Sequence, residues 1–162
     1  MPKVVFLDFD GVLLPDPLAQ AQTDAGLTFS NYLEKVQFDT SCVDNLLKLV
    51  HDVEAEIVLS TSWALGHSLS ELGNCLRRNG IDPGLIWSYD DPSSREWMTP
   101  RRLTSNRAQE IQWWMYNHAD VSNWCAIDDL SVIGQLGPNA VITDPTLGFD
   151  DVSLQKAMAI MS

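Results

Sequence analysis

Carboxylate side chains follow two short apolar runs of the sequence. Asp8 and Asp10 stand two positions apart after the first run, and Asp128 and Asp129 are adjacent after a later one. Gathered carboxylates raise one another's pKa, and a bound divalent cation removes that electrostatic cost. Because these oxygen ligands have no His or Cys near them in the sequence, the pattern favours Mg²⁺ held beside a phosphate group.

A run of hydroxyl residues has a similar position in the chain. Ser60, Thr61 and Ser62 follow the apolar run 56–59 and precede Trp63. Such hydroxyls either contact a bound phosphate or cap a following helix, and the residues alone favour neither interpretation.

Strands and helices alternate along the chain and must position these polar residues. Apolar β-branched runs predict strands, and apolar residues at helical spacing predict helices. Strands separated by helices form a parallel sheet, and ligands bind at the carboxyl ends of its strands. We therefore expect the polar clusters to meet at one edge of an α/β fold, a three-layer, Rossmann-like parallel sheet. The expected strands are 3–8, 56–60, 85–87, 124–127 and 140–143, and the expected helices are 42–49, 69–76, 106–118, 130–136 and 154–161.

Two stretches interrupt this alternation. Residues 15–40 contain three Pro or Gly breakers and little periodicity, so we expect a long loop or a small insertion or flap there. Residues 88–105 are polar, contain Pro92 and Pro100, and predict a loop. Since no linker-like stretch divides the chain, we expect a single domain over 1–162, without a large cap domain.

The first acidic cluster carries a resemblance to a known family. The segment Asp-Phe-Asp-Gly-Val-Leu at 8–13 resembles the first motif of the haloacid dehalogenase (HAD) superfamily of phosphatases and phosphotransferases. The resemblance implies that Asp8 is the nucleophile that forms an aspartyl-phosphate. It also implies that Asp10 is the general acid for the leaving group and then the general base for water.

Three further motifs of that superfamily occur in the same order. The second, a hydroxyl residue that contacts the phosphate, matches Thr61, with Ser60 as the neighbouring alternative. The third, a basic residue near the start of a helix, matches Arg107. The fourth is an acidic pair after a strand and matches Asp128 and Asp129.

The resemblance further implies a metal site. Asp8, Asp128 and the backbone carbonyl of Asp10 would hold Mg²⁺, and Asp129 completes the acidic set. In addition, the Ser-Thr-Ser-Trp stretch resembles a subgroup of the superfamily that is associated with nucleic-acid repair proteins. The resemblance therefore covers most of the chain, from 8 to 129.

These residues also have plain structural interpretations. Asp and Gly favour turns, and Asp128 or Asp129 could simply cap the helix that follows. Arg107 could be a solvated surface charge. A cation in the first turn of a helix opposes the helix dipole, however, and that small cost is recovered when a phosphate binds there.

The basic residues are unevenly distributed. Four of the ten lie between positions 95 and 107. Arg101 and Arg102 either form a local clamp for an anionic substrate or belong to an ordinary solvated loop. Trp97 in the same segment could stack on a base or another ring.

Overall composition excludes several classes of protein. The 162 residues include 22 acidic and 10 basic ones, for a net charge of −12, which argues against a broad nucleic-acid-binding surface and against an anionic membrane. Three cysteines without a C-x-x-C pair predict buried thiols rather than a disulfide framework or a zinc site. With neither a signal-peptide core nor a membrane-length apolar run, we expect a cytoplasmic protein.

Together with the resemblance, these features predict a Mg²⁺-dependent phosphomonoester hydrolase that acts through an aspartyl-phosphate. Its substrate would be a phosphorylated small molecule, a nucleotide or a nucleic-acid end. The alternative is a catalytically silent phosphate- or nucleotide-binding protein on the same fold. A signalling receiver domain is disfavoured, because the strand that ends at Ser60 offers no phospho-accepting Asp.

Overall fold

The computed structural model describes residues 1–162 and contains one four-stranded parallel sheet in the order β2-β1-β3-β4. The strands are β1 (Lys3–Leu7), β2 (Glu56–Leu59), β3 (Asn123–Asp128) and β4 (Ala140–Ile142). The chain extends the sheet on one side of β1 with β2 and then on the other side with β3. Ligand sites in open α/β sheets lie where the strand order reverses in this way, here between β1 and β3.

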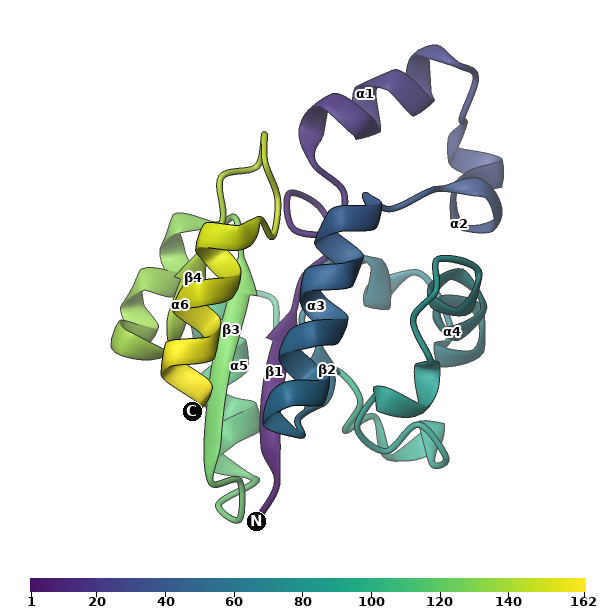
Figure 1. Cartoon of the computed structure of the whole chain (residues 1–162). Helices are drawn as coiled ribbons and strands as arrows, with labels where there is room; N and C mark the ends of the chain where they lie inside the picture. Colours follow the sequence, from purple (N-terminus) through teal and green to yellow (C-terminus); the bar gives the residue numbers. More distant parts are fainter.

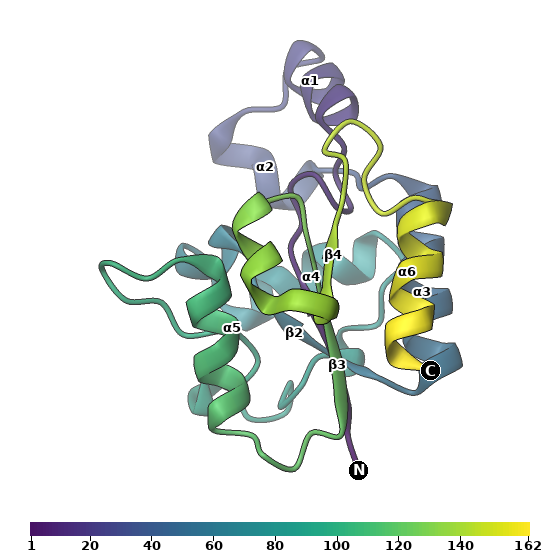
Figure 2. The same ribbon diagram turned by 90° about the vertical axis from the view of Figure 1, so that its left-hand side faces the viewer.

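Helices cover both faces of the sheet (Figures 1 and 2). On one face, α3 (Thr40–Val53) packs beside α6 (Asp151–Met161). On the other face, α5 (Arg107–Tyr116) packs beside η5 (Ser131–Asn139), a 3₁₀ segment. The helix α4 (Leu69–Arg78) lies beyond β2, at the opposite edge from β4. This arrangement confirms the predicted three-layer α/β fold.

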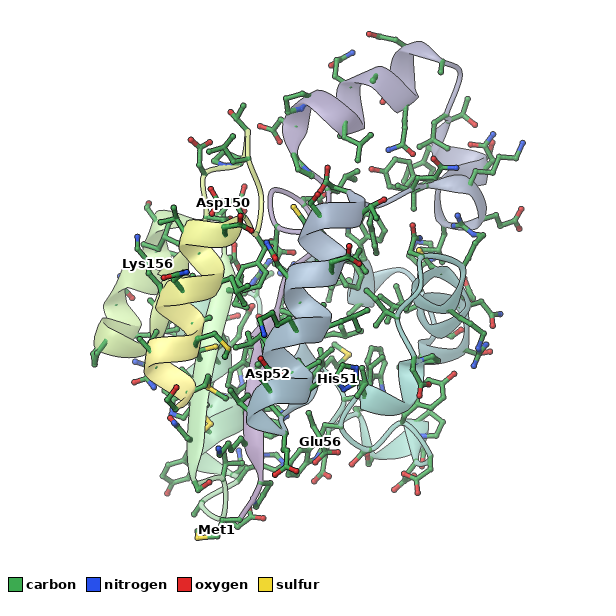
Figure 3. All side chains as sticks on the ribbon, in the orientation of Figure 1. Met1, His51, Asp52, Glu56, Asp150 and Lys156 are labelled. Carbon is green, nitrogen blue, oxygen red and sulfur yellow. The ribbon has the colours of Figure 1, made fainter.

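The strands of this sheet contribute to two separate cores. Val5 and Leu7 of β1 belong to the core under α3 and α6, whereas Val4 and Phe6 belong to the core under α5 and η5. All four side chains are fully buried. A strand buried on both faces has a continuous apolar sequence, which is why the run at 3–8 predicts a central parallel strand. Side chains fill the space between the helices and the sheet (Figure 3).

Polar residues define where two of the helices begin. Asp150, labelled in Figure 3 at the start of α6, accepts a hydrogen bond of 2.9 Å from the backbone N–H of Ser153. Asn106 and Gln109 form a reciprocal capping box at the start of α5. The capping box confirms the predicted start of this helix, and it places Arg107 in the first helical turn.

The segment 15–40, for which the sequence predicts a loop or a small insertion, is largely helical. It contains α1 (Asp16–Asp24), η1 (Phe29–Asn31) and α2 (Tyr32–Lys35). No residue of α1 is fully buried, and only Leu18 and Ala19 pack partly against the core, so α1 has no repeating apolar pattern that could reveal it. In Figure 1, α1 and α2 stand beyond the carboxyl ends of the strands.

The predicted strand at 85–87 is wrong. Leu85 is the last residue of a 3₁₀ turn, η3 (Pro83–Leu85), Ile86 makes only an isolated parallel bridge to Ile57, and Trp87 already belongs to a turn. Met98 makes a second isolated bridge, to Leu59. The outer edge of β2 is therefore covered by two single-residue bridges instead of another strand.

None of the helices of the fold combines the length and the apolar content that crossing a membrane requires.

Candidate active site

The register of the central strands brings their end residues together. Leu7 of β1 pairs with Leu59 of β2 on one side and with Ile127 of β3 on the other. The next position of each strand therefore lies at the same carboxyl edge of the sheet. The residues at these positions are Asp8, Ser60 and Asp128.

Asp8 is a buried carboxylate with only 5% of its surface exposed. Its Oδ1 accepts a hydrogen bond of 2.8 Å from the backbone N–H of Phe9. Burial raises the pKa of Asp8 to about 6, although the charge of Arg107 and a hydrogen bond from the Thr61 hydroxyl oppose this shift. The carboxylate of Asp8 therefore carries a desolvation cost that a nearby cation relieves.

Asp128, the last residue of β3, is buried even more completely, at 1% exposure. Burial and the neighbouring charge of Asp8 raise the pKa of Asp128 to about 8. Its Oδ1 accepts a hydrogen bond of 2.9 Å from the backbone N–H of Leu130, so it caps the following turn. Its Oδ2 faces Arg107, so capping is only part of its role.

Arg107 is buried at the carboxyl edge of the sheet, with 8% exposure, so its interpretation as a solvated surface charge is wrong. Its Nη1 donates a hydrogen bond of 2.6 Å to Oδ2 of Asp128 and another to the carbonyl of Ser60. The same nitrogen lies 3.5 Å from Oδ2 of Asp8. A cation at this helix start is thus stabilised by two carboxylates.

Thr61 and Ser60 have different surroundings. The Thr61 hydroxyl caps η2 (Ser62–Leu65) by accepting a hydrogen bond of 3.3 Å from the backbone N–H of Trp63, and it also faces Asp8. The Ser60 hydroxyl instead accepts a hydrogen bond of 3.4 Å from Thr99. The capping interpretation therefore holds for Thr61, and its side chain, rather than that of Ser60, also faces Asp8.

Three carboxylates form a group that could hold a metal ion. Ligand oxygens of Asp8, Asp128 and Asp129 all lie within 4.8 Å of one another. Gly11 makes room for this group, because a Cβ atom at that position would lie 2.4 Å from Oδ2 of Asp129. Hard oxygen ligands without His or Cys fit Mg²⁺. The side chain of Asp10 lies outside the group, so its predicted metal contact stays limited to the backbone carbonyl.

The side chain of Asp10 bonds to Trp63 rather than joining the acidic group. Its Oδ2 accepts a hydrogen bond of 2.9 Å from the indole N–H of Trp63. Partial desolvation raises the pKa of Asp10, the bond from Trp63 opposes the rise, and the charge of Asp129 adds to it. Asp8 and Asp10, two positions apart, therefore have different partners, which suits different chemical roles.

Glu110 is a buried part of this site that the sequence does not reveal. Only 2% of it is exposed, and its Oε1 lies 3.7 Å from Nε of Arg107, one helical turn earlier. Its Oε2 accepts a hydrogen bond of 2.7 Å from Ser105 and another of 3.3 Å from Nε of Arg101. Glu110 therefore connects Arg107 to the segment that precedes α5. The i, i+3 spacing to Arg107 is the only sequence signal for it.

Of the basic residues between 95 and 107, Arg107 contacts the acidic group, whereas Arg101 and Arg102 contact other residues. Arg101 pairs with Glu110, and the guanidinium carbon of Arg102 lies 4.3 Å from the ring centroid of Trp113. Trp97 is only 5% exposed and donates its indole N–H to the carbonyl of Pro92. The expectation that Trp97 is an open stacking ring is wrong, because its ring packs into the core.

Comparison with known proteins gives one match. A family model described as "HAD domain in Swiss Army Knife RNA repair proteins" matches residues 4–154. The matched region runs from β1 into α6 and contains every carboxylate of the site. No curated protein and no solved structure matches the chain significantly.

Proposed function

The chain belongs to the family of HAD domains in Swiss Army Knife RNA repair proteins, and on this basis we propose that it is a Mg²⁺-dependent phosphomonoester hydrolase that acts on phosphorylated RNA ends. The observation that carries the proposal is the placement of Asp8. It lies 3.5 Å from the guanidinium of Arg107 and within the acidic group of Asp128 and Asp129. A phosphate that enters this edge therefore meets a nucleophile and a cation together.

The first step transfers the phosphoryl group to the protein. A carboxylate oxygen of Asp8 attacks phosphorus, and the bond between phosphorus and the leaving oxygen breaks. Asp10 gives its proton to that oxygen, which leaves as an alcohol. The hydrogen bond from the Trp63 indole, 2.9 Å long, holds the Asp10 carboxyl group for this transfer.

The second step releases phosphate. A water molecule attacks the phosphorus of the aspartyl-phosphate while Asp10 accepts one of its protons. The bond between phosphorus and the Asp8 oxygen breaks, so the carboxylate of Asp8 is restored and inorganic phosphate leaves. Asp10 is protonated again, as the next cycle requires.

Charge on the phosphoryl oxygens must be stabilised in both steps. Arg107 and the Thr61 hydroxyl face Asp8 and are the protein groups that can do so. Asp8, Asp128 and Asp129 would hold Mg²⁺, which when bound neutralises negative charge on the carboxylates and the phosphate.

Turnover of an aryl phosphate with Mg²⁺ tests the reaction. We expect Asp8→Asn to lower kcat by about 10³-fold or more, since it removes the nucleophile. Asp120→Asn is the matched control, because Asp120 is an exposed acid that precedes β3, outside the site. Equal rates for the wild type and Asp8→Asn would contradict the mechanism. Saturable phosphate binding without release under any metal would favour the catalytically silent binding protein.

The choice of RNA ends over other phosphates is tested separately. Phosphate release is compared for 3′- and 5′-phosphorylated RNA oligonucleotides and for sugar phosphates. We expect a higher kcat/KM for at least one of the RNA ends. Equal or better use of the sugar phosphates would contradict RNA as the substrate and leave the hydrolytic mechanism standing.

A further inference from the structure

A cavity of about 420 Å³ opens beside the carboxylate of Asp10. Three aromatic side chains line it, those of Phe29, Tyr32 and Trp63. We infer that this aromatic cavity is a stacking site for the base of the nucleotide whose terminal phosphate is removed. The inference rests on the proposed function, because it places the base on the side of the leaving group.

The rings of the aromatic cavity come from segments that are far apart in the sequence. Phe29 and Tyr32 belong to η1 and α2, which stand beyond the carboxyl ends of the strands, and Trp63 belongs to η2. The rings of Tyr32 and Trp63 meet edge to face, with centroids 5.3 Å apart. Phe9 supports Trp63 in a second edge-to-face contact at 5.1 Å. Trp63 is therefore held in position before any ligand arrives.

Phe29 has no packing role that accounts for its position. Its exposed fraction is 99%, and it belongs to neither hydrophobic core. A large apolar side chain at the mouth of a cavity gains free energy only when something covers it. Flat aromatic faces of this kind stack on bases without regard to sequence, since every base has a π-face.

The charges around the aromatic cavity favour an uncharged planar group. Its remaining lining residues are Ser62, Gly66 and His67, and neither Lys nor Arg lines it. The His67 ring lies 3.3 Å from a carboxylate oxygen of Glu71, so it already has an anionic partner. A second phosphate would therefore meet Asp10 without a compensating cation. The volume lies within the range of small-ligand pockets, about 300–1,000 Å³.

The position of Asp10 indicates which part of the substrate would enter the aromatic cavity. Asp10 lines the aromatic cavity, and its Oδ2 accepts the hydrogen bond from Trp63. The group that protonates the leaving oxygen thus borders the cavity. When the leaving group is the terminal nucleoside, its base is the planar part that can reach the rings.

Three phosphate esters test the inference. Adenosine 5′-monophosphate and adenosine 3′-monophosphate carry a base, and ribose 5-phosphate is the matched ester without one. For the wild-type protein we expect kcat/KM for at least one adenosine ester to exceed that for ribose 5-phosphate by about tenfold, the effect of stacking one base. Calorimetric titration with the same esters measures their Kd independently of turnover.

Phe29→Ala is the decisive variant, because removing a fully exposed side chain does not disturb the core. We expect it to raise KM and Kd for the preferred adenosine ester and to remove most of the preference for the base. Tyr116→Ala is the control, since Tyr116 is an aromatic residue with 85% exposure at the end of α5. We expect it to keep that preference.

Trp63→Phe separates stacking from the positioning of Asp10. The substitution keeps a ring but removes the indole N–H that bonds to Asp10. We expect a lower kcat on all three esters and an unchanged preference for the base. Loss of the preference with an unchanged kcat would contradict the division of roles.

Failure of the inference and failure of the proposed function give different results. Equal kcat/KM and Kd values for all three esters, or equal losses in Phe29→Ala and Tyr116→Ala, would overturn the base site and leave the hydrolase intact. Base-dependent binding that Phe29→Ala abolishes, without phosphate release from any ester, would overturn the hydrolase and support the base site.

Discussion

Nη1 of Arg107 lies 2.6 Å from Oδ2 of Asp128, and both side chains are almost completely buried. The same nitrogen also contacts Asp8 and the carbonyl of Ser60. One atom of one side chain therefore offsets much of the negative charge at the end of the sheet. The protein itself supplies part of the positive charge that its carboxylates need, and in the proposed function Mg²⁺ would supply the rest.

Substitution of Arg107 tests how much of the positive charge at the site comes from this side chain. Because Nη1 alone contacts Asp8, Asp128 and the carbonyl of Ser60, Lys can replace part of these contacts, and we expect Arg107→Lys to lower kcat/KM by about tenfold. Arg107→Met removes the cation that both buried carboxyl groups contact, so we expect their pKa values to rise further and the free energy of unfolding to fall by about 3–5 kcal/mol. Phosphate release and denaturant unfolding measure the two effects.

Arg77→Met is the control for these variants, since Arg77 is exposed on α4 and bonds only to Asn74. We expect it to change neither activity nor stability by more than the usual surface effect of about 0.5 kcal/mol. Wild-type activity in Arg107→Met would show that Arg107 has no part in the reaction.

The fold and the main site residues were predictable because their signals are local. A buried parallel strand has a continuous apolar sequence, as in β1, and the residue that follows such a strand lies at the ligand-binding edge. Asp8 and Asp128 follow or end such runs, so their meeting could be expected from the strand pattern alone. The start of α5 could also be predicted, because Asn106 and Gln109 have the sequence spacing of a capping box.

The remaining features depend on contacts that leave no periodic pattern. The helix α1 has no fully buried residue and packs only Leu18 and Ala19 partly against the core, too few for a periodic apolar pattern. Phe29 and Trp63 meet at one cavity only because the segment 15–40 folds over the end of the sheet. Glu110 is a charged residue in the core, where sequence rules place apolar ones.

Charge reversal distinguishes the roles of the two arginines in the basic segment. Arg101→Glu places a second carboxylate beside the buried Glu110, so we expect a loss of about 1–3 kcal/mol in the free energy of unfolding. Arg102 is exposed and contacts the ring of Trp113, so we expect Arg102→Glu to spare stability and to raise KM for an RNA end. Unfolding curves and steady-state kinetics measure the difference, and an unchanged kcat/KM in both variants would exclude an anion clamp.

Substitution of Gly11 tests whether the acidic group needs the space that this glycine leaves beside Asp129. It has φ +73°, and a Cβ there would lie 2.4 Å from Oδ2 of Asp129, so Gly11→Ala both strains the backbone and displaces Asp129, which the proposed function assigns to Mg²⁺. Gly26→Ala is the matched control, with φ +102° and no atom within 4 Å of the new Cβ. We expect both variants to lose about 1 kcal/mol or more of stability, and only Gly11→Ala to weaken Mg²⁺ binding. Equal Mg²⁺ affinities, measured by calorimetry, would show that Asp129 does not depend on Gly11.

Metal addition provides a test that does not require turnover. A ligand that binds only the folded state at about 100 times its Kd adds about 2.7 kcal/mol of stability, which for a chain of this size corresponds to a rise of about 5–10 °C in Tm. We expect that rise when Mg²⁺ replaces a chelator, and a smaller one in Asp129→Asn. Asp120→Asn, remote from the acidic group, should respond as the wild type does. An unchanged Tm of the wild type in Mg²⁺ would argue against the metal site.

The three cysteines provide a test of the buried core. Cys42, Cys75 and Cys125 are all free and buried, as the sequence predicts. Burial raises the pKa of Cys42 and of Cys125 to about 12 and also raises that of Cys75. Because the thiolate is the reactive form, all three thiols should resist a thiol-specific reagent in the folded protein at neutral and mildly alkaline pH.

The same shifts determine how stability depends on pH. In the unfolded chain the thiols ionise with a pKa of about 8.5, whereas in the folded chain they keep their protons to a higher pH. Their contribution to stability is therefore complete below about pH 8.5 and is lost as the pH rises toward their folded pKa values. We expect reagent titration at pH 8 to detect thiols only after denaturant is added, and the free energy of unfolding to decrease from about pH 9 upward. Rapid labelling of any thiol in the native protein would contradict the burial on which this prediction depends.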